Sequence, residues 1–292
     1  MGFENAFLDW VRRQQRATDA VPLAAGDDLA ALRFDAADLV LAGIDQVLDG
    51  VHFDLPACGP HAAGRKAMNR NLSDCAAMAC LPAAALLSVA LPRGTTMETA
   101  QAIYAGARDA GLAFDCVIVG GDTATWDARL AITVAVLGRS AGVTPLRRDG
   151  ARPGEGVYVT GPLGGSIFGR HLSFTPRVRE ARALAVAHTI SAMMDLSDGL
   201  AADLPRLCAA SGVGAVIDAA AVPVHADVAR HGDARSALEH ALGDGEDYEL
   251  LFTTTAVPAN AVRIGTIIEG AGVWLDYAGR REPLRIAGYE HA

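Results

Sequence analysis

Aspartate side chains recur beside glycine, serine or asparagine at the ends of apolar segments of this sequence. Six segments share the pattern: Gly26-Asp27-Asp28, Ile44-Asp45, Asn71-Leu72-Ser73-Asp74, Gly120-Gly121-Asp122-Thr123, Asp195-Leu196-Ser197-Asp198-Gly199 and Gly243-Asp244-Gly245-Glu246-Asp247. An aspartate held by a tight glycine turn is a hard oxygen ligand with little conformational entropy to lose. Several such carboxylates in one pocket would repel one another unless cations lay between them. The pattern predicts a magnesium-dependent phosphate site.

Two of these motifs are the most informative. Residues 120–123 follow a short β run, so their backbone amides could bind a phosphate and Asp122 its metal, although an ordinary turn has the same composition. In the second motif, Asp195 ends a strand and Asp198 opens a helix, on either side of Ser197. Helix capping would account for Ser197 or Asp198 but not for Asp195 as well. We therefore favour a functional interpretation of this second motif.

Four further polar residues are candidates with a plainer alternative. Asn71 and Asp74 lie three apart on one face of an apolar helix, where burial without partners would cost on the order of several kcal/mol. The alternative is a solvated helix face. His52 could hydrogen-bond a substrate phosphate or fill a satisfied polar niche. Glu246 could hold a substrate amine or ring nitrogen, or belong to a hairpin turn.

Apolar periodicity predicts alternating strands and helices after an amphipathic opening helix. In the first half we expect strands at 39–44, 116–119 and 130–137, a helix at 61–80, and a helix from a Thr95/Glu98 capping box to about Gly111. In the second half we expect strands at 157–160, 193–195, 248–253 and 262–268, and helices at 177–190 and from 197 or 198 to near Gly212. The charged, glycine- and proline-containing segment 147–154 separates two domains, 1–146 and 147–292.

Composition excludes several classes of protein. Apolar residues make up 51% of the 292 residues, which fits an α/β or α+β enzyme. The formal charge of −9 offers no basic footprint for nucleic acid or an anionic membrane, so phosphate recognition must use metals and backbone amides. No run of 18 apolar residues occurs, and we expect a soluble, cytoplasmic protein. The five cysteines lack paired CxxC spacing, which favours reduced thiols.

Taken together, the motifs resemble those of thiamine-monophosphate kinases, members of the superfamily that includes aminoimidazole ribonucleotide synthetase. The matching elements are residues 26–28, Asp45 through 51–53, Lys66 through 71–74, 120–123, 148–154, 195–199 and 245–252. The resemblance implies an amino-terminal α/β domain that contributes strands to a barrel across a homodimer, and a carboxy-terminal α+β domain. It also implies ATP as co-substrate and several magnesium ions in a cleft.

Carried over by motif, the resemblance assigns roles to individual residues. Metal ligands would be Asp28, Asp45, Asp74, Asp122, Asp195 and Asp198; ATP would contact Gly121, Asp122, Arg148 and Ser197; and the thiamine phosphate would contact His52, Glu246 and Ile286. Asp74, Asp122 and Arg148 would be catalytic. Two positions depart from the family: Gly43-Ile44 replaces a hydroxyl pair, and Ile286 replaces an aromatic residue that would face the thiamine rings.

The reaction that the resemblance implies is direct in-line transfer of the ATP γ-phosphoryl group to thiamine monophosphate, giving thiamine diphosphate. The attacking oxygen is already an anion near neutral pH, so no general base is needed and the catalytic problem is electrostatic. Two alternatives stay open. One is another ATP-dependent synthetase of the same superfamily, and the other is a non-catalytic nucleotide or metal sensor.

Overall fold

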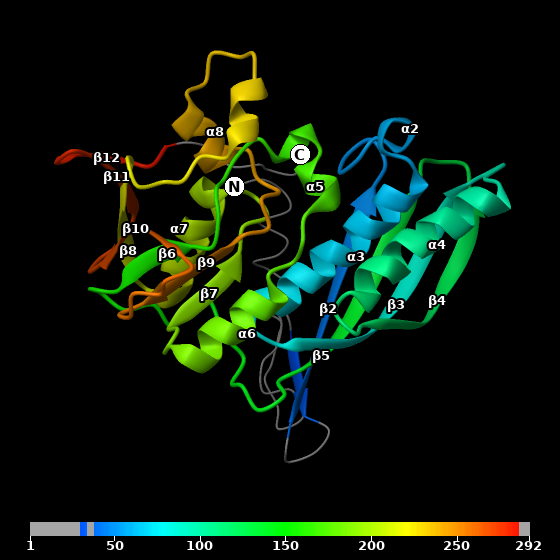
Figure 1. The fold of residues 1–292 in the computed structure, drawn as a ribbon, viewed down its shortest axis with the longest axis horizontal. Helices are drawn as coiled ribbons and strands as arrows, with labels where there is room; N and C mark the ends of the chain where they lie inside the picture. The colour runs from blue at the N-terminus through cyan, green and yellow to red at the C-terminus, as the bar shows by residue number, and fades with distance from the viewer. Residues whose placement is uncertain (1–29, 34–37, 286–292) are drawn as a thin grey trace.

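Two β-sheets organise the chain in the computed structural model, which describes residues 30–33 and 38–285 (Figure 1). The opening helix, Asp28 and Ile286 lie outside the described residues. The first sheet has the order β1-β2-β5-β3-β4. Its strands are β1 (Ala30–Arg33), β2 (Leu39–Leu48), β3 (Leu81–Pro92), β4 (Val117–Trp126) and β5 (Ala131–Arg139).

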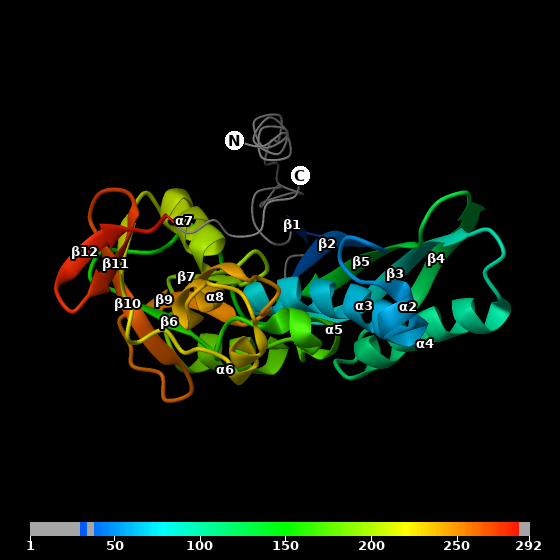
Figure 2. The ribbon, with the colours of Figure 1, turned by 90° about the horizontal axis from the view of Figure 1, so that it is seen from above.

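Helices cover one face of this first sheet (Figure 2). They are α2 (Leu55–Cys58), α3 (Pro60–Ala77) and α4 (Met97–Leu112). The opposite face carries exposed apolar side chains that neighbouring strands place side by side. Ile44 on β2 and Leu86 on β3 both pair with Ala135 on β5, and they are 68% and 45% exposed. An apolar sheet face of this kind normally marks an interaction surface.

The second sheet has the order β12-β11-β8-β10-β6-β9-β7. Its strands are β6 (Gly156–Val159), β7 (Ala192–Asp195), β8 (Gly214–Asp218), β9 (Leu250–Thr254), β10 (Val262–Ile268), β11 (Val273–Tyr277) and β12 (Arg280–Pro283). The helical elements are η1 (Ser166–Phe168), α5 (Arg170–Ser173), α6 (Val178–Ala187), α7 (Leu200–Ser211), η2 (Ala226–Arg230) and α8 (Ala237–Gly243). Strand alternation sends Leu251 to the core beneath α7, and Leu250 and Phe252 to the core beneath α6.

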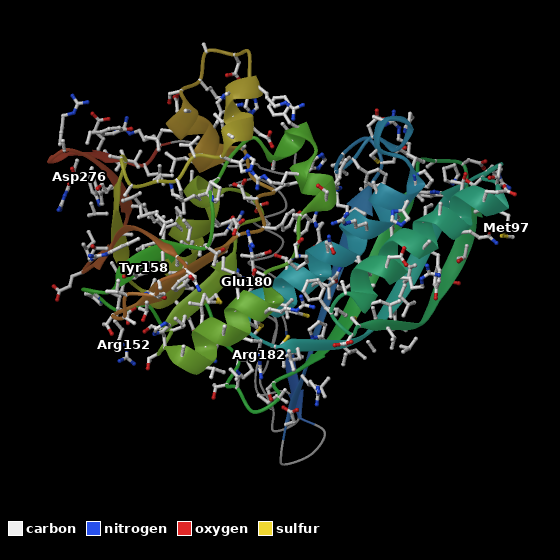
Figure 3. All side chains as sticks on the ribbon, viewed as in Figure 1. Met97, Arg152, Tyr158, Glu180, Arg182 and Asp276 are labelled. Atoms are coloured by element: carbon white, nitrogen blue, oxygen red, sulfur yellow. The ribbon has the colours of Figure 1, made fainter. Side chains whose placement is uncertain are left out.

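Helix α3 joins the two halves of the molecule. Its end, at Ala76, packs in the same apolar cluster as Met193 of β7. Arg182 of α6, labelled in Figure 3, reinforces the junction by donating to the carbonyl oxygens of Ala79 at 3.0 Å and Ser140 at 2.7 Å. Because α3 contacts both sheets, side chains on this helix can meet residues of either half. Among the described residues, no helix is both long and apolar enough to cross a membrane.

The structure confirms most expected elements and corrects their ends. Strand β2 continues past Asp45 to Leu48, so Asp45 is an internal strand residue rather than a terminal one. Thr96, not Thr95, caps α4, because its hydroxyl accepts from the amide of Thr99 at 3.2 Å. The expected Ser197 or Asp198 cap of α7 is also wrong. The N-cap is Gly199, and no side chain caps that helix.

Gly120-Gly121-Asp122 is the largest correction. We expected these residues to follow the end of a short strand, but they lie inside β4, where Asp122 is opposite Ser88 of β3. A Cβ on Gly121 would lie only 1.8 Å from the carbonyl oxygen of Leu87. Close packing of two parallel strands therefore explains this glycine without a phosphate.

Candidate active site

Two loops of the second half interlock to form one wall of the site. The backbone amides of Glu246 and Tyr248 donate to the carbonyl oxygens of Ser197 and Leu196, at 2.7 and 2.8 Å. Gly245, with φ of +73°, permits this approach, because a Cβ there would lie 3.0 Å from the Ser197 carbonyl oxygen. The two predicted motifs at 195–199 and 243–247 are thus a single structural unit.

A cavity of about 940 Å³ opens between this unit and the first half of the molecule. That volume is in the range that holds a small-molecule ligand. Its lining comes from residues 50–54, 57, 58 and 70 on one side, and from 166–169, 171, 172, 197, 198, 231, 235, 243, 244, 246 and 248 on the other. Of the residues predicted from the sequence, His52, Ser197, Asp198 and Glu246 share this cavity.

A fully buried lysine anchors Glu246 beside the cavity. The Nζ atom of Lys66 lies 2.6 Å from Glu246 Oε1, 2.5 Å from the His52 carbonyl oxygen and 2.8 Å from His171 Nδ1. His171 Nδ1 is also 3.2 Å from Glu246 Oε2, so it can accept from Lys66 when neutral or donate to Glu246 when protonated. Burial alone would raise the pKa of Glu246, but hydrogen bonding to His171 and the charge of Lys66 lower it to about 2. Glu246 is therefore an anion at neutral pH.

Asp45 and Asp195 lie close enough to interact electrically, and the charge of Arg70 acts on both. Arg70 Nε donates to Asp45 Oδ2 at 2.9 Å, and Ser73 Oγ donates to Asp195 Oδ2 at 2.5 Å. Burial raises the pKa of Asp195 to about 6, against the Ser73 hydrogen bond, and the negative charge of Asp45 adds to the rise. These carboxylates repel each other as a cation-binding pair would.

The backbone of Asp198 is held by the carboxylate of Asp203, which is fully buried. Asp203 Oδ2 accepts from the amide of Asp198 at 3.0 Å, and Arg206 Nη1 contacts Asp203 Oδ1 at 2.8 Å and also Asp198 Oδ2. Burial and the charge of Asp198 raise the pKa of Asp203 to about 8. This network fixes the direction of the loop that carries Ser197 and Asp198.

Three further predicted residues, His52, Arg148 and Asp74, are placed less completely, and only His52 lines the cavity. His52 Nδ1 accepts from the Leu48 amide at 3.0 Å, which places the proton of the neutral ring on Nε2. The charge of Arg148 opposes the pKa rise of Asp195, so its guanidinium acts on that carboxylate. Asp74 follows Ser73 directly on α3. These three positions remain predictions as functional residues.

Gly121 and Asp122 lie apart from this cavity within the single chain. They line a separate hollow of about 530 Å³ between α4 and strands β3 and β4, beside Leu87, Val89 and Tyr104. Asp28 and Ile286 lie outside the described residues. The described part of one chain therefore gathers only some of the predicted residues into one cavity.

Sequence reasoning missed four polar side chains of the site: Arg70, His171, Asp203 and Arg206. Asp203 could have been found from the sequence, because an acid appears among the apolar positions Leu200, Leu204 and Leu207 of α7. The sequence evidence for Arg70 was weaker: a charged residue beside Asn71 in an apolar helix. No local pattern indicated His171, whose role depends on Lys66 in the other half.

The chemical type of the donors fits magnesium, although among the described residues Asp45, Asp195 and Asp198 do not bring three ligand atoms within 4.8 Å of one another. Asp45, Asp195 and Asp198 offer hard carboxylate oxygens, the ligand type that Mg²⁺ prefers. Burial is the main cause of the raised pKa of Asp195, and the nearby charge of Asp45 adds to it. In addition, the buried Oδ1 atom of Asn71 has no hydrogen-bond partner among the described residues. An unpartnered amide oxygen is a further possible ligand or water acceptor.

Comparison with known proteins defines the class to which this fold and site belong. A family model described as AIR synthase related protein, N-terminal domain, matches residues 26–140, and one described as AIR synthase related protein, C-terminal domain, matches residues 159–273. The molecule is a two-domain protein of the AIR synthase-related class. A HypE hydrogenase maturation protein, 18% identical with a TM-score of 0.70, shares the fold.

Closer relatives narrow the class to one family. The thiamine-monophosphate kinase of Rhodopirellula baltica is 36% identical over 93% of this chain and 91% of its own length. That of Salmonella typhimurium is 35% identical over 82% and 78%. The solved structure of AaThiL complexed with AMPPCP and TMP has a TM-score of 0.86 at 29% identity, covering 100% of this chain and 99% of that one. This chain belongs to the thiamine-monophosphate kinase family.

Proposed function

We propose that this protein transfers the γ-phosphoryl group of ATP to thiamine monophosphate. The observation that carries the proposal is the cavity in which Asp198, Ser197, His52 and Glu246 converge, beside the Asp45 and Asp195 carboxylates. Carboxylates and cations in its lining support phosphoryl transfer between two anionic substrates. Relatives with the same fold are thiamine-monophosphate kinases, and one was solved with AMPPCP and TMP.

In the proposed reaction an oxygen of the thiamine monophosphate phosphate attacks the γ-phosphorus of ATP in line. The new P–O bond forms as the bond to the β,γ-bridging oxygen breaks, and ADP leaves with that electron pair. The acceptor oxygen is an anion, so no side chain has to remove a proton. Arg148 and the Nε2–H of His52 would stabilise phosphate charge, and the Glu246 anion would balance the cationic thiazolium.

Magnesium would be held by Asp45, Asp74, Asp195 and Asp198, with Asp28 and Asp122 as further ligands of the family motif. When bound, it neutralises phosphate charge. Other side chains of the protein orient these ligands. Asp203 and Arg206 orient the Asp198 loop, and Ser73 orients Asp195 at 2.5 Å.

A homodimer would complete the site. We propose that the apolar face of the first domain, residues 1–146, meets the same face of a second copy and that residues 147–292 form the second domain. Exposure of Ile44, Leu86 and Val119, at 68%, 45% and 60%, supports such an interface. Asp122 lies on the same sheet, and dimerisation offers a route by which it could approach a phosphate site that its own chain does not bring near.

Incubation with ATP, magnesium and thiamine monophosphate tests the proposal. We expect equal amounts of ADP and thiamine diphosphate, detected by chromatography. Formation of a cyclised ribonucleotide, ADP and free phosphate from an open-chain ribonucleotide and ATP would instead support a synthetase of the same superfamily. Nucleotide binding without any product would support a sensor and contradict the kinase.

A further inference from the structure

The positive charges around the cavity differ in how many hydrogen-bond donors they still have to offer. The Lys66 ammonium lies within 2.8 Å of three atoms that can accept, which accounts for all of its N–H groups when His171 Nδ1 carries no proton. Arg170 lies behind the cavity and donates from Nη2 to the Gly164 carbonyl oxygen and to Asp247, at 2.7 and 3.0 Å. Arg235 contacts Asp233 and Asp244. Arg170 and Arg235 thus each already bind two acceptors of the protein.

Arg70 is different. It lines the cavity, its side chain is 14% exposed, and it follows Lys66 by one helical turn on α3. Its Nε atom donates to Asp45 at 2.9 Å, and among the described residues this is its only hydrogen-bond acceptor. A guanidinium has five N–H donors in a rigid fork, so the terminal nitrogens of Arg70 retain donors for a ligand.

The surroundings keep Arg70 charged and oriented. Burial disfavours its charge, but Tyr248, Asp45 and Glu246 more than offset this and raise the pKa of Arg70. The ion pair with Asp45 holds the Nε edge of the guanidinium, which leaves the fork formed by the terminal nitrogens as the available edge. A guanidinium fork held in this way matches two oxygens of one phosphate group.

We propose that Arg70 binds the phosphate of the acceptor and makes the site selective for a phosphate monoester over the corresponding alcohol. This rests on the proposed kinase function. The acceptor is favoured over ATP because two residues assigned to the acceptor, His52 and Glu246, line the cavity with Arg70, against one assigned to ATP, Ser197. The charge of Glu246 also acts on Arg70 directly. Arg70 is then a specificity-determining residue that the family motifs around Lys66 and Asn71 did not single out.

The test compares Arg70→Gln with the wild-type enzyme and with Arg65→Gln. Arg65 is a matched control, because it lies on the same helix outside the cavity and donates to the Ser173 carbonyl oxygen. We expect Arg70→Gln to raise KM for thiamine monophosphate about tenfold or more, which is the loss of about 1.4 kcal/mol. KM for ATP should change less than about twofold, and Arg65→Gln should change neither by more than that.

A binding measurement separates this inference from the proposed function. Calorimetry with thiamine and thiamine monophosphate gives the preference for the phosphate without requiring turnover. Arg70→Gln should lower that preference about tenfold, and Arg70→Lys should restore part of it because the charge returns without the fork. An unchanged preference, or an equal rise in KM for both substrates, overturns the inference. A wild-type enzyme without kinase activity overturns the proposed function instead, whatever its binding preference.

Discussion

At the scale of single residues, the site depends on ionised groups that the fold holds close together. Asp45 and Asp195 interact electrically, while Lys66 and His171 hold Glu246 as an anion. Each charge has at least one oriented partner, so the arrangement is preorganised before substrates bind. Substitutions that preserve shape and remove charge should therefore affect activity more than folding.

Asp195→Asn tests this for the carboxylate cluster. The amide has the same shape and can still accept from Ser73, so the fold should be kept. Turnover should fall by at least about 100-fold and the magnesium requirement should rise, because one charged ligand is lost. Steady-state kinetics over a magnesium titration measures both effects. Asp109→Asn, which changes an exposed acid on α4, is the control. Equal activity of the two variants would contradict the role of Asp195 as a metal ligand.

Glu246 should make stability depend on pH. Its pKa is lowered from 4.5 to about 2 in the folded protein, so its ionised form stabilises the fold above pH 4.5. That contribution is lost as the pH falls from 4.5 through about 2. The stability difference between wild type and Glu246→Gln should thus be larger at pH 6 than at pH 3, measured by urea unfolding. Glu180→Gln, 45% exposed on α6, is the control, and a difference that grows toward low pH would contradict the prediction.

At the scale of elements, the site is made by loops that approach one another more closely than most residues allow. The loop after β7 and the loop before β9 exchange backbone hydrogen bonds from Glu246 and Tyr248, both with φ of +53°. Left-handed conformations at residues other than glycine store strain of about 1–3 kcal/mol each, and such strain concentrates at functional sites. The backbone hydrogen bonds between the two loops offset this cost, and the loops hold Asp198 and Glu246 at one cavity.

Gly245→Ala probes that approach. The new Cβ would lie 3.0 Å from the Ser197 carbonyl oxygen. The alanine would also have to keep the φ of +73°. Gly212→Ala, at the end of α7, shares the positive φ of +68° but has nothing within 4 Å, so it isolates a backbone cost of about 1–2 kcal/mol. We expect Gly245→Ala to be the more destabilised variant in thermal unfolding and the only one of the two to lose activity. Equal losses of stability and activity in both variants would show that the close approach of the two loops at Gly245 is unimportant.

At the scale of the whole molecule, α3 links a first domain with one uncovered face to a second domain covered on both faces of its sheet. The uncovered face carries Ile44, Leu86 and Leu137, which are 68%, 45% and 37% exposed. Burial of apolar area contributes roughly 25 cal/mol per Å², so pairing two such faces would stabilise a dimer. This argument predicts that oligomeric state and activity depend on the same surface.

Leu86→Asp should dissociate the dimer, since a charge would be buried without a partner in the interface. Light scattering should report a monomer, and turnover should fall if residues such as Asp122 act across the interface. Val257→Asp is the matched control, because Val257 is 85% exposed in the second half, away from the uncovered face. A Leu86→Asp protein that stays dimeric, or a wild type that is monomeric, would contradict the proposed interface.

The sequence by itself determined the local chemistry of this protein. Apolar periodicity located most strands and helices, and the recurring aspartates indicated a phosphate and magnesium site and the family. These features were readable because helix and strand periods and motif spacings are properties of short segments. The same locality explains the errors at Thr95, Asp45 and residues 120–122, where strand pairing and capping geometry decided the ends of elements.

Only the tertiary structure decided which groups meet. Asp195 contacts Ser73 across 122 residues, and Arg70 pairs with Asp45 across 25. The partners of Arg70 and Lys66 became known only in the structure. They show that Lys66 holds Glu246, whereas Arg70 keeps N–H donors for a ligand. Such contacts arise when distant segments pack around a shared core, and no short-range pattern in the chain records which charges that packing will bring together.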